Sequence, residues 1–121
     1  MRITSGTFKS RIIKAPSGIR PTLDNVRKAI FDILGDVVGG SRVLDLFAGS
    51  GALGLEALSR GAGSCGFVDN SRSSVKAIKE NIEALIPQAG QALGAEVVYA
   101  DSLAAIRRFS GEGARFDFIF M

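Results

Sequence analysis

The sequence predicts an α/β protein with a parallel, doubly wound sheet. Short apolar segments alternate with amphipathic helical segments over most of the 121 residues, which is typical of a parallel sheet with helices on both faces. A glycine loop, Gly49-Ser50-Gly51, joins the first of these strands to the next helix. Acidic residues end three consecutive strands. We therefore expect a ligand site at the carboxyl ends of the strands.

The segment before this alternation predicts a β-hairpin followed by a helix. Strands 2–5 and 8–15 flank the turn residues Ser5-Gly6, and Pro16-Ser17-Gly18 ends the second strand. One side of the hairpin would be covered by Ile3, Phe8, Ile12 and Ile13. A helix over 23–34 follows, with Thr22 as its N-cap. Its expected buried stripe is Leu23, Val26, Ile30, Ile33 and Leu34.

The remainder predicts strands and helices in alternation. The expected strands are 42–47, 65–69, 96–100 and 116–121, the helices 52–60, 72–86 and 102–109, and the loops 35–40 and 87–94. We divide the chain into a basic hairpin, 1–22, and a cofactor-binding domain, 23–121. The sequence stops on an apolar strand with no turn after it, and natural domains rarely end this way. We therefore expect part of a longer protein, with an incomplete sheet of four strands.

Composition excludes several kinds of chemistry. The chain has no histidine and one cysteine, Cys65, so a histidine-based triad, an imidazole metal site and an intrachain disulfide are impossible. Cys65 lies in an apolar strand and is expected to be a buried, inert thiol. No apolar run is long enough to cross a bilayer, and no signal peptide is recognisable. A cytoplasmic protein without a metal is the expectation.

Charge is concentrated near the N-terminus. Residues 1–28 contain seven basic side chains and one acidic side chain, whereas the rest of the chain is mildly acidic. A basic segment on an acidic body indicates a polyanionic partner docked at one end. The alternative is a solvated charged hairpin without a partner.

Asp45 decides which nucleotide-like ligand the glycine loop favours. This carboxylate lies in the strand, four residues before Gly49. It would repel a pyrophosphate and attract a cation, because charges interact strongly at short range in a crevice. S-adenosylmethionine carries an ammonium and a sulfonium and no phosphate, so the charge favours it over a nicotinamide dinucleotide. The alternative is a structural loop in which Asp45 caps local N–H groups.

Two further acids end the next strands. Asp69, 24 residues after Asp45, is placed to accept hydrogen bonds from ribose hydroxyls. Asp101 ends the third strand and could accept a bond from an adenine amino group. Each could instead cap the helix that follows, Asp69 with Asn70 and Ser71, and Asp101 before Ser102.

These motifs resemble a known family. The run from Asp45 to Gly54 looks like motif I of class I S-adenosylmethionine-dependent methyltransferases. The continuation from Leu55 to Ala62 and the run from Arg20 to Leu34 are more specific. Together they resemble the bacterial 16S ribosomal RNA guanine-N2 methyltransferases, the family that modifies guanine-966, over the whole chain.

The resemblance implies a Rossmann-like class I methyltransferase fold and direct methyl transfer from S-adenosylmethionine to the exocyclic amine of a guanine. The family's catalytic loop, Asp-Pro-Pro-Tyr, would follow Met121, so no catalytic residue is named within the chain. The expected cofactor-binding residues are Asp45, Phe47, Ala48, Gly49, Ser50, Gly51, Asp69, Asn70, Asp101 and Ser102.

The implied partner is 16S rRNA or a small-subunit assembly particle, bound by a monomer. The expected RNA-binding residues are Arg2, Lys9, Arg11, Lys14 and Arg20, although Arg20 and Thr22 could instead approach the methionine end of the cofactor. Three alternatives stay open at this point: an adenine-N6 DNA methyltransferase, a non-catalytic fragment that binds cofactor or RNA, and a nicotinamide-dependent oxidoreductase, which Asp45 disfavours.

Overall fold

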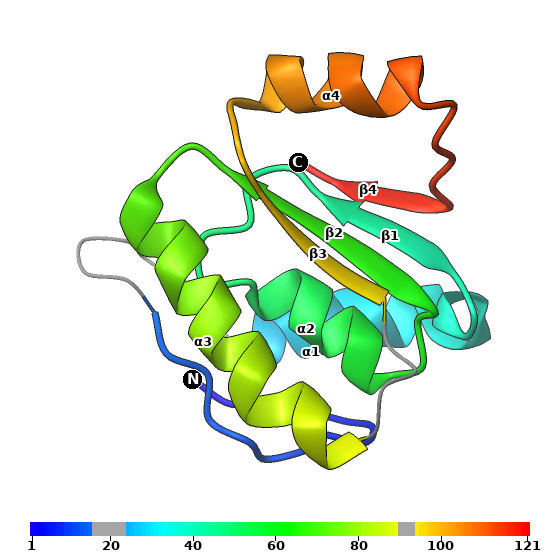
Figure 1. Ribbon diagram of the computed structural model, residues 1–121. Helices are drawn as coiled ribbons and strands as arrows, with labels where there is room; N and C mark the ends of the chain where they lie inside the picture. The colour runs from blue at the N-terminus through cyan, green and yellow to red at the C-terminus, as the bar shows by residue number, and fades with distance from the viewer. Residues whose placement is uncertain (16–23, 90–93) are drawn as a thin grey trace.

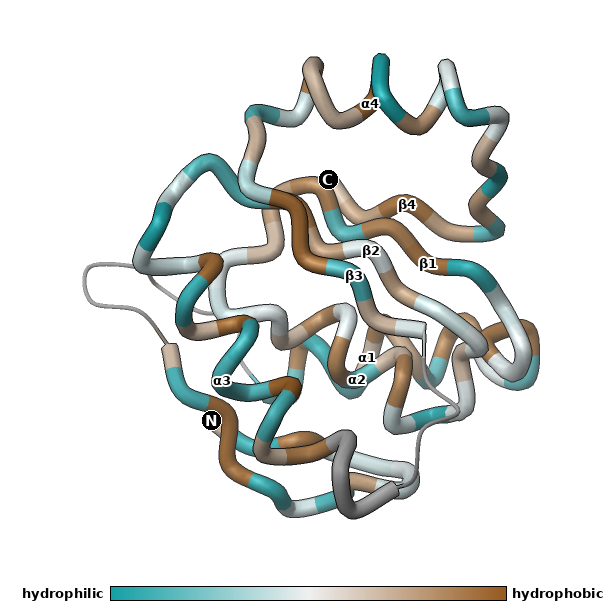
Figure 2. Tube along the Cα trace, in the orientation of Figure 1, coloured by the Kyte–Doolittle hydropathy of each residue, from teal (hydrophilic) through white to brown (hydrophobic). Residues whose placement is uncertain are grey.

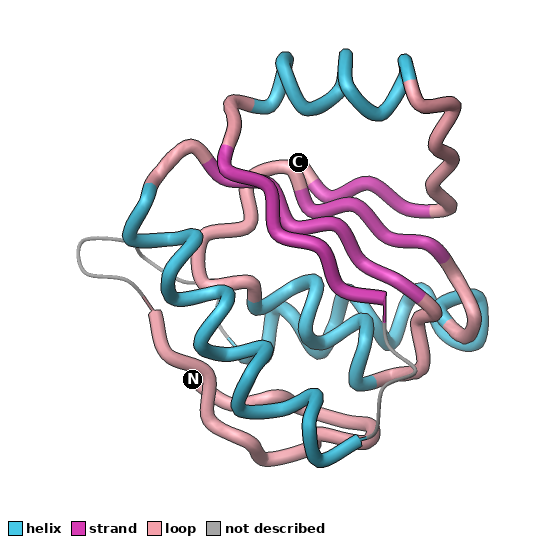
Figure 3. Tube along the Cα trace, in the orientation of Figure 1, coloured by secondary structure: helices cyan, strands magenta, loops and turns pink. Residues whose placement is uncertain are grey.

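A parallel sheet between two helix layers forms the body of the protein (Figures 1 and 3). The computed structural model describes residues 1–15, 24–89 and 94–121. Over these residues the sheet has four strands, β1 (Arg42–Asp45), β2 (Ser64–Asp69), β3 (Gly94–Tyr99) and β4 (Phe118–Phe120). All pair in parallel, in the order β3-β2-β1-β4. The predicted α/β, doubly wound architecture is confirmed.

The helices are divided between the two faces of the sheet. The helices α1 (Asp24–Leu34), α2 (Ala52–Ser59) and α3 (Arg72–Ala89) lie on one face, and α4 (Ser102–Gly111) lies on the other (Figure 1). A short 3₁₀ helix, η1 (Gly35–Val38), connects α1 to β1. The chain runs outward from β1 to β3 and then returns through α4 to the other side of β1. The carboxyl end of β1 is therefore the topological switch point, where ligands bind in such sheets.

Side chains that alternate along the strands form a core on each face. Val43, Cys65 and Phe67 belong to the cluster under α1, α2 and α3. Leu44 and Val68 point the other way and pack with residues of α4. Figure 2 shows hydrophobic residues along the strands, whereas α3 and α4 alternate between hydrophobic and hydrophilic positions. This is the pattern of a sheet buried on both faces.

Two predicted helix features are wrong. α3 does not end at residue 86 but includes Pro87 and continues to Ala89. A proline removes the backbone donor to the carbonyl four residues earlier, but the helix continues two residues beyond it. On α1 the predicted apolar stripe is only partly correct: Ile30 and Leu34 pack against the core, but Ile33 is 84% exposed and Val26 45%. Arg27 and Phe31, which the stripe did not include, are buried. Leu23 and the predicted N-cap Thr22 fall outside the described residues.

The N-terminal segment is more irregular than the predicted hairpin. A single antiparallel bridge joins Arg2 to Ile12, and a chain of turns replaces the expected strands between them. Ile3, Phe8 and Ile13 are buried in the same cluster as β1 and β2, but Ile12 is 63% exposed and does not cover the core. Residues 1–15 are thus packed onto the body, and the expected domain boundary at residue 22 lies among residues that are not described.

Gly6 sets how closely this segment approaches α2. Its φ is +86°, and a Cβ built there would lie 1.9 Å from the carbonyl oxygen of Ser59. The Ser59 hydroxyl donates to the Ser5 carbonyl at 2.6 Å and accepts from the Phe8 N–H at 2.9 Å. The Thr7 N–H donates to the Ser59 carbonyl at 2.8 Å. The turn therefore docks by backbone contact, which only glycine permits here.

A buried ion pair joins three elements that are distant in sequence. The Arg27 Nε donates to Glu56 Oε1 at 3.0 Å, and both side chains are fully buried. The Glu56 carboxylate also accepts from the Thr4 N–H at 2.9 Å and from the Arg60 Nε at 2.9 Å. Arg27 donates to the Arg2 carbonyl as well. The N-terminal segment, α1 and α2 therefore share one charged centre, which the sequence patterns did not predict.

The carboxyl of Glu56 stays ionised in this centre. Burial raises its pKa, but the hydrogen bonds from Thr4, Arg60 and Arg27 outweigh that effect and leave the pKa below its ordinary value of 4.5. A carboxyl whose pKa falls on folding stabilises the protein above its unfolded pKa. This contribution is lost as the pH falls through the folded value.

We predict that Glu56→Gln lowers the free energy of unfolding by about 3–5 kcal/mol, because it breaks a fully buried ion pair and leaves the Arg27 guanidinium with only the partly exposed Asp24 as a counter-charge. Urea denaturation at pH 7 measures the change. The matched control is Glu80→Gln: Glu80 forms an exposed pair with Lys76 at 4.0 Å, so its loss should leave stability nearly unchanged. Equal effects of the two substitutions would contradict the assigned role of the buried pair.

Candidate functional site

The glycine loop is held at the switch point by backbone hydrogen bonds to both neighbouring strands. The Leu46 N–H donates to the Phe120 carbonyl of β4, and the Ala48 N–H donates to the Val68 carbonyl of β2, each at 3.0 Å. Gly49 and Gly51 have φ values of +59° and +83°. These left-handed conformations favour glycine and turn the chain from β1 into α2. The N-terminus of α2 then begins directly at the loop.

Gly54 allows α2 to lie directly on β2. A Cβ at this position would lie 2.3 Å from Cε1 of Phe67 and 2.7 Å from Sγ of Cys65. No side chain fits in that space, since these atoms are already part of the packed core. Gly54 therefore permits a close contact between α2 and β2.

Asp45 lies beneath the loop with its side chain pointing at loop and helix N–H groups. It is 3% exposed, and it accepts backbone hydrogen bonds from Phe47 and Gly54. Burial raises the pKa of its carboxyl from 3.8 to about 7, although these two bonds act in the opposite direction. The structure therefore shows the capping role that the sequence left open as the alternative. A carboxylate can accept further bonds, so capping leaves room for a role toward a ligand.

Asp69 joins the end of β2 to the loop. Its Oδ2 accepts from the Gly49 N–H at 2.9 Å, and its Oδ1 accepts from the Ser71 N–H at 2.9 Å. It is half-buried, and the neighbouring Asn70 is exposed. Asp69 thus fixes the middle of the glycine loop in addition to capping the turn before α3.

Asp101 is the N-cap of α4. Its Oδ1 accepts from the Ala104 N–H at 2.8 Å, its side chain is exposed, and Ser102 beside it is half-buried. The helix-capping alternative is again what the structure shows. Asp45, Asp69 and Asp101 nevertheless follow β1, β2 and β3, whose carboxyl ends meet at one edge of the sheet (Figure 1).

The loop residues differ in accessibility. Phe47 is 65% exposed, whereas Ala48 and Ser50 are buried. The Phe47 ring is therefore accessible to solvent, while the side chains of Ala48 and Ser50 face the protein. The site thus combines a glycine loop whose Ala48, Gly49 and Gly51 N–H groups bond within the protein, three carboxyls of which that of Asp45 is buried, and one exposed aromatic ring.

Cys65 does not contribute a nucleophile. It is 1% exposed, and burial raises the pKa of its thiol well above the ordinary 9.0, with the Asp45 charge adding to the effect. The reactive form of cysteine is the thiolate, which this environment suppresses. Within the described residues, no three His, Cys, Asp or Glu side chains come together to hold a metal ion.

The basic residues of the N-terminal segment differ in their exposure to solvent. Lys9 and Lys14 are exposed. Arg2 is exposed and donates to the Ser10 carbonyl at 2.9 Å, whereas Arg11 is half-buried and donates to the Ala84 carbonyl of α3 at 2.9 Å. Arg20 lies outside the described residues. Arg27, which the sequence places among the basic residues of this end, is buried and offers no charge to a partner.

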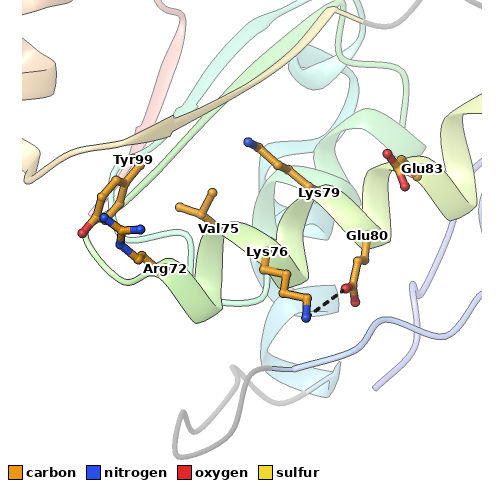
Figure 4. A pocket seen from close by; sticks show the side chains of 7 residues that line it. All are labelled: Arg72, Val75, Lys76, Lys79, Glu80, Glu83 and Tyr99. Atoms are coloured by element: carbon orange, nitrogen blue, oxygen red, sulfur yellow. Dashed lines mark ion pairs between the residues drawn. The ribbon is translucent and has the colours of Figure 1, made fainter.

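A separate groove of about 480 Å³ runs along α3 beside the edge strand β3 (Figure 4). The Arg72 guanidinium lies 5.3 Å from the centre of the Tyr99 ring at one end of it. Further along, the cations of Lys76 and Lys79 are followed by the acids Glu80 and Glu83. This mixed charge distinguishes the groove from the acidic site at the glycine loop.

The fold is that of class I methyltransferases, with the glycine loop and its acids at the usual place. The model of the family described as "Conserved hypothetical protein 95" matches residues 1–121, and the chain belongs to this family. Among the described residues, no helix has the length and apolar character needed to span a membrane.

Relatives in this family agree with the resemblance noted in the sequence. "Putative rRNA methyltransferase YlbH" of Bacillus subtilis is 48% identical over 87 residues, which cover 70% of this chain and 47% of that protein. "Ribosomal RNA small subunit methyltransferase D" of Escherichia coli K12 is 40% identical over 87 residues, which cover 70% of this chain and 44% of that protein. The chain spans about half the length of these curated relatives.

A solved structure supports the same fold. A hypothetical protein of Thermus thermophilus is 35% identical, with a TM-score of 0.86, over 100% of this chain and 67% of that chain. The superposition therefore includes the N-terminal segment as well as the sheet.

We predict that stability falls as the pH rises from 5 to 8, because Asp45 must ionise in a buried site. A folded pKa of about 7 exceeds the unfolded value of 3.8, so the contribution is complete below 3.8 and is lost as the pH passes 7. The free energy of unfolding should drop by about 2–3 kcal/mol over this range. The chain has no histidine to obscure the change.

Urea denaturation at several pH values measures this slope. Asp45→Asn should abolish it, whereas Asp36→Asn, at an exposed position of η1, should keep it. A wild-type protein of constant stability between pH 5 and 8 would show that Asp45 is ionised throughout.

Proposed function

We propose that the protein is a methyltransferase that uses S-adenosylmethionine to methylate the exocyclic N2 amine of a guanine in small-subunit rRNA. The observation that supports this most directly is the buried Asp45 carboxyl beneath the glycine loop. A cationic ligand favours the ionised form of this group, whereas a pyrophosphate disfavours it. The names of the relatives support the rRNA substrate.

In this proposal the cofactor lies across the carboxyl ends of β1, β2 and β3. Asp69 would accept hydrogen bonds from the ribose hydroxyls with the lone pairs that Gly49 and Ser71 leave free. Asp101 would accept a hydrogen bond from the adenine amino group. The glycine loop, with Phe47 exposed at its start, would border the methionine portion.

The cofactor supplies the electrophilic methyl group, so the chain's task is alignment. Holding amine, methyl and sulfur in line can lower the barrier by roughly 7–11 kcal/mol. The target guanine must leave its stack to reach the site. The groups that hold its amine belong, by the resemblance, to an Asp-Pro-Pro-Tyr loop that would follow β4 beyond Met121.

The N-terminal segment is the proposed RNA contact. Lys9, Lys14 and Arg2 are exposed on it, and Arg11 and Arg20 complete the proposed set. These cations would bind phosphates and position the RNA, since phosphate contacts fix register without reading bases. A cytoplasmic, monomeric enzyme completes the proposal.

We predict that S-adenosylhomocysteine binds the protein and that NAD does not, as measured by isothermal calorimetry. Asp69→Ala should weaken binding of the homocysteine compound by about 1.5–3 kcal/mol, because hydrogen bonds to a charged group are removed. Asp36→Ala, on η1 away from the loop, is the matched control and should bind normally. Binding of NAD alone would exclude the proposed class.

We predict that binding of a single-stranded RNA of mixed sequence weakens steeply with salt. Lys9→Gln combined with Lys14→Gln should reduce the slope of log affinity against log salt by about 1.4, because each phosphate that is no longer neutralised lowers the slope by roughly 0.7. Fluorescence anisotropy between about 50 and 200 mM salt measures the slope. Lys76→Gln, on α3, is the control; an unchanged slope in the double variant would remove the segment from the RNA interface.

A further inference from the structure

Asn81 connects the N-terminal segment to the glycine loop. It lies on α3 and is 4% exposed. Its Nδ2 donates to the Lys14 carbonyl at 2.9 Å and to the Ser50 carbonyl at 3.0 Å. Its Oδ1 accepts from the Lys14 N–H at 3.0 Å. One side chain therefore bonds residues 14 and 50, which are distant in sequence.

These three bonds use both amide hydrogens and the amide oxygen. The pair of bonds to Lys14 matches both main-chain groups of that residue, as a neighbouring strand would. Because the site is buried, a broken bond leaves a polar group without water to replace it. A shift of either the segment or the loop therefore disturbs the contact that holds the other.

The two partners of Asn81 belong to the two proposed binding surfaces. Lys14 is at an exposed, basic part of the N-terminal segment, and its side chain takes no part in the bonds to Asn81. Ser50 lies between Gly49 and Gly51, where the loop must meet the cofactor. The N-terminal segment is also fixed at its other end, where Ser59 and Glu56 of α2 hold residues 4–8.

We infer that Asn81 is a positioning residue that couples the RNA-binding segment to the cofactor loop, so that each ligand strengthens binding of the other. The inference rests on the proposed function for the identity of the two ligands. A cofactor that orders the loop fixes the Ser50 carbonyl, which fixes the Asn81 amide and through it the Lys14 backbone. RNA that orders the segment acts along the same bonds in reverse, because coupling between two sites is reciprocal.

The test measures RNA affinity with and without saturating S-adenosylhomocysteine, using a single-stranded RNA of mixed sequence. In the wild-type protein the cofactor product should tighten RNA binding by at least about fivefold, the low end of the usual range for coupled sites. In Asn81→Ala this factor should fall to about one, while each ligand still binds alone. Asn81→Asp, nearly the same shape but without the donor, should behave similarly and serves if the alanine variant fails to fold.

Two control variants separate coupling from charge and from folding. Lys14→Ala keeps both backbone bonds to Asn81 and removes only the cation, so it should weaken RNA binding and retain the fivefold coupling. Ser74→Ala, on α3, removes a buried hydroxyl that has no hydrogen-bond partner among the described residues, and should change neither quantity.

Hydrogen exchange gives a second readout that needs no RNA. S-adenosylhomocysteine should slow exchange of the Lys14 amide in the wild-type protein, and in Asn81→Ala it should protect the loop alone. If the homocysteine compound binds but the coupling survives in both Asn81 variants, the coupling inference is wrong and the proposed function stands. If the compound does not bind the wild-type protein, the proposed function and this inference both fail.

Discussion

The ion pair between Arg27 and Glu56 is the constraint on which the rest of the molecule depends. Burying two charges is unfavourable unless hydrogen bonds and opposite charges compensate each of them. Here the compensating groups come from parts of the chain that are distant in sequence. Thr4 and Arg60 complete the shell of Glu56. The N-terminal segment and α1 therefore both contribute to the charged centre on α2, and α2 begins at the glycine loop. The position of the candidate site therefore depends on the contacts around Arg27 and Glu56.

The site is built mainly from backbone. Backbone hydrogen bonds to β2 and β4 hold the loop. The Asp45 carboxyl accepts from the Phe47 and Gly54 N–H groups, and the Asp69 carboxyl accepts from the Gly49 N–H. These carboxyl side chains stabilise the loop in the folded protein. Only the lone pairs that these hydrogen bonds do not use can accept from a ligand. Asp45, Asp69 and Asp101 are caps in the structure, and this role is compatible with the cofactor contacts proposed for them.

The positions of the four sheet strands and the order of the helices between them followed from the sequence, because short apolar runs and glycine turns are local signals; the strands expected in residues 2–15 did not form. The buried charged and polar contacts could not be predicted in this way. Glu56 is the one charged residue of the mostly apolar helix α2, which was an available sign of a buried charge. Arg27 counts among the basic residues of the N-terminal end, and no pattern marked it as buried. On α1, spacing correctly placed Ile30 and Leu34 against the core but also included the exposed Val26 and Ile33, and it missed the buried Arg27 and Phe31. Periodicity predicts that a helix has an apolar face, but it does not predict which part of the fold packs against that face.

The contact between Gly6 and the Ser59 carbonyl limits how the protein can diverge. Position 6 admits no side chain, so substitutions there would be eliminated by selection. Lys9, only three residues away, is exposed and can change without disturbing that contact. A fixed backbone contact beside an exposed cation therefore allows the surface charge of this segment to change while its packing on α2 is kept.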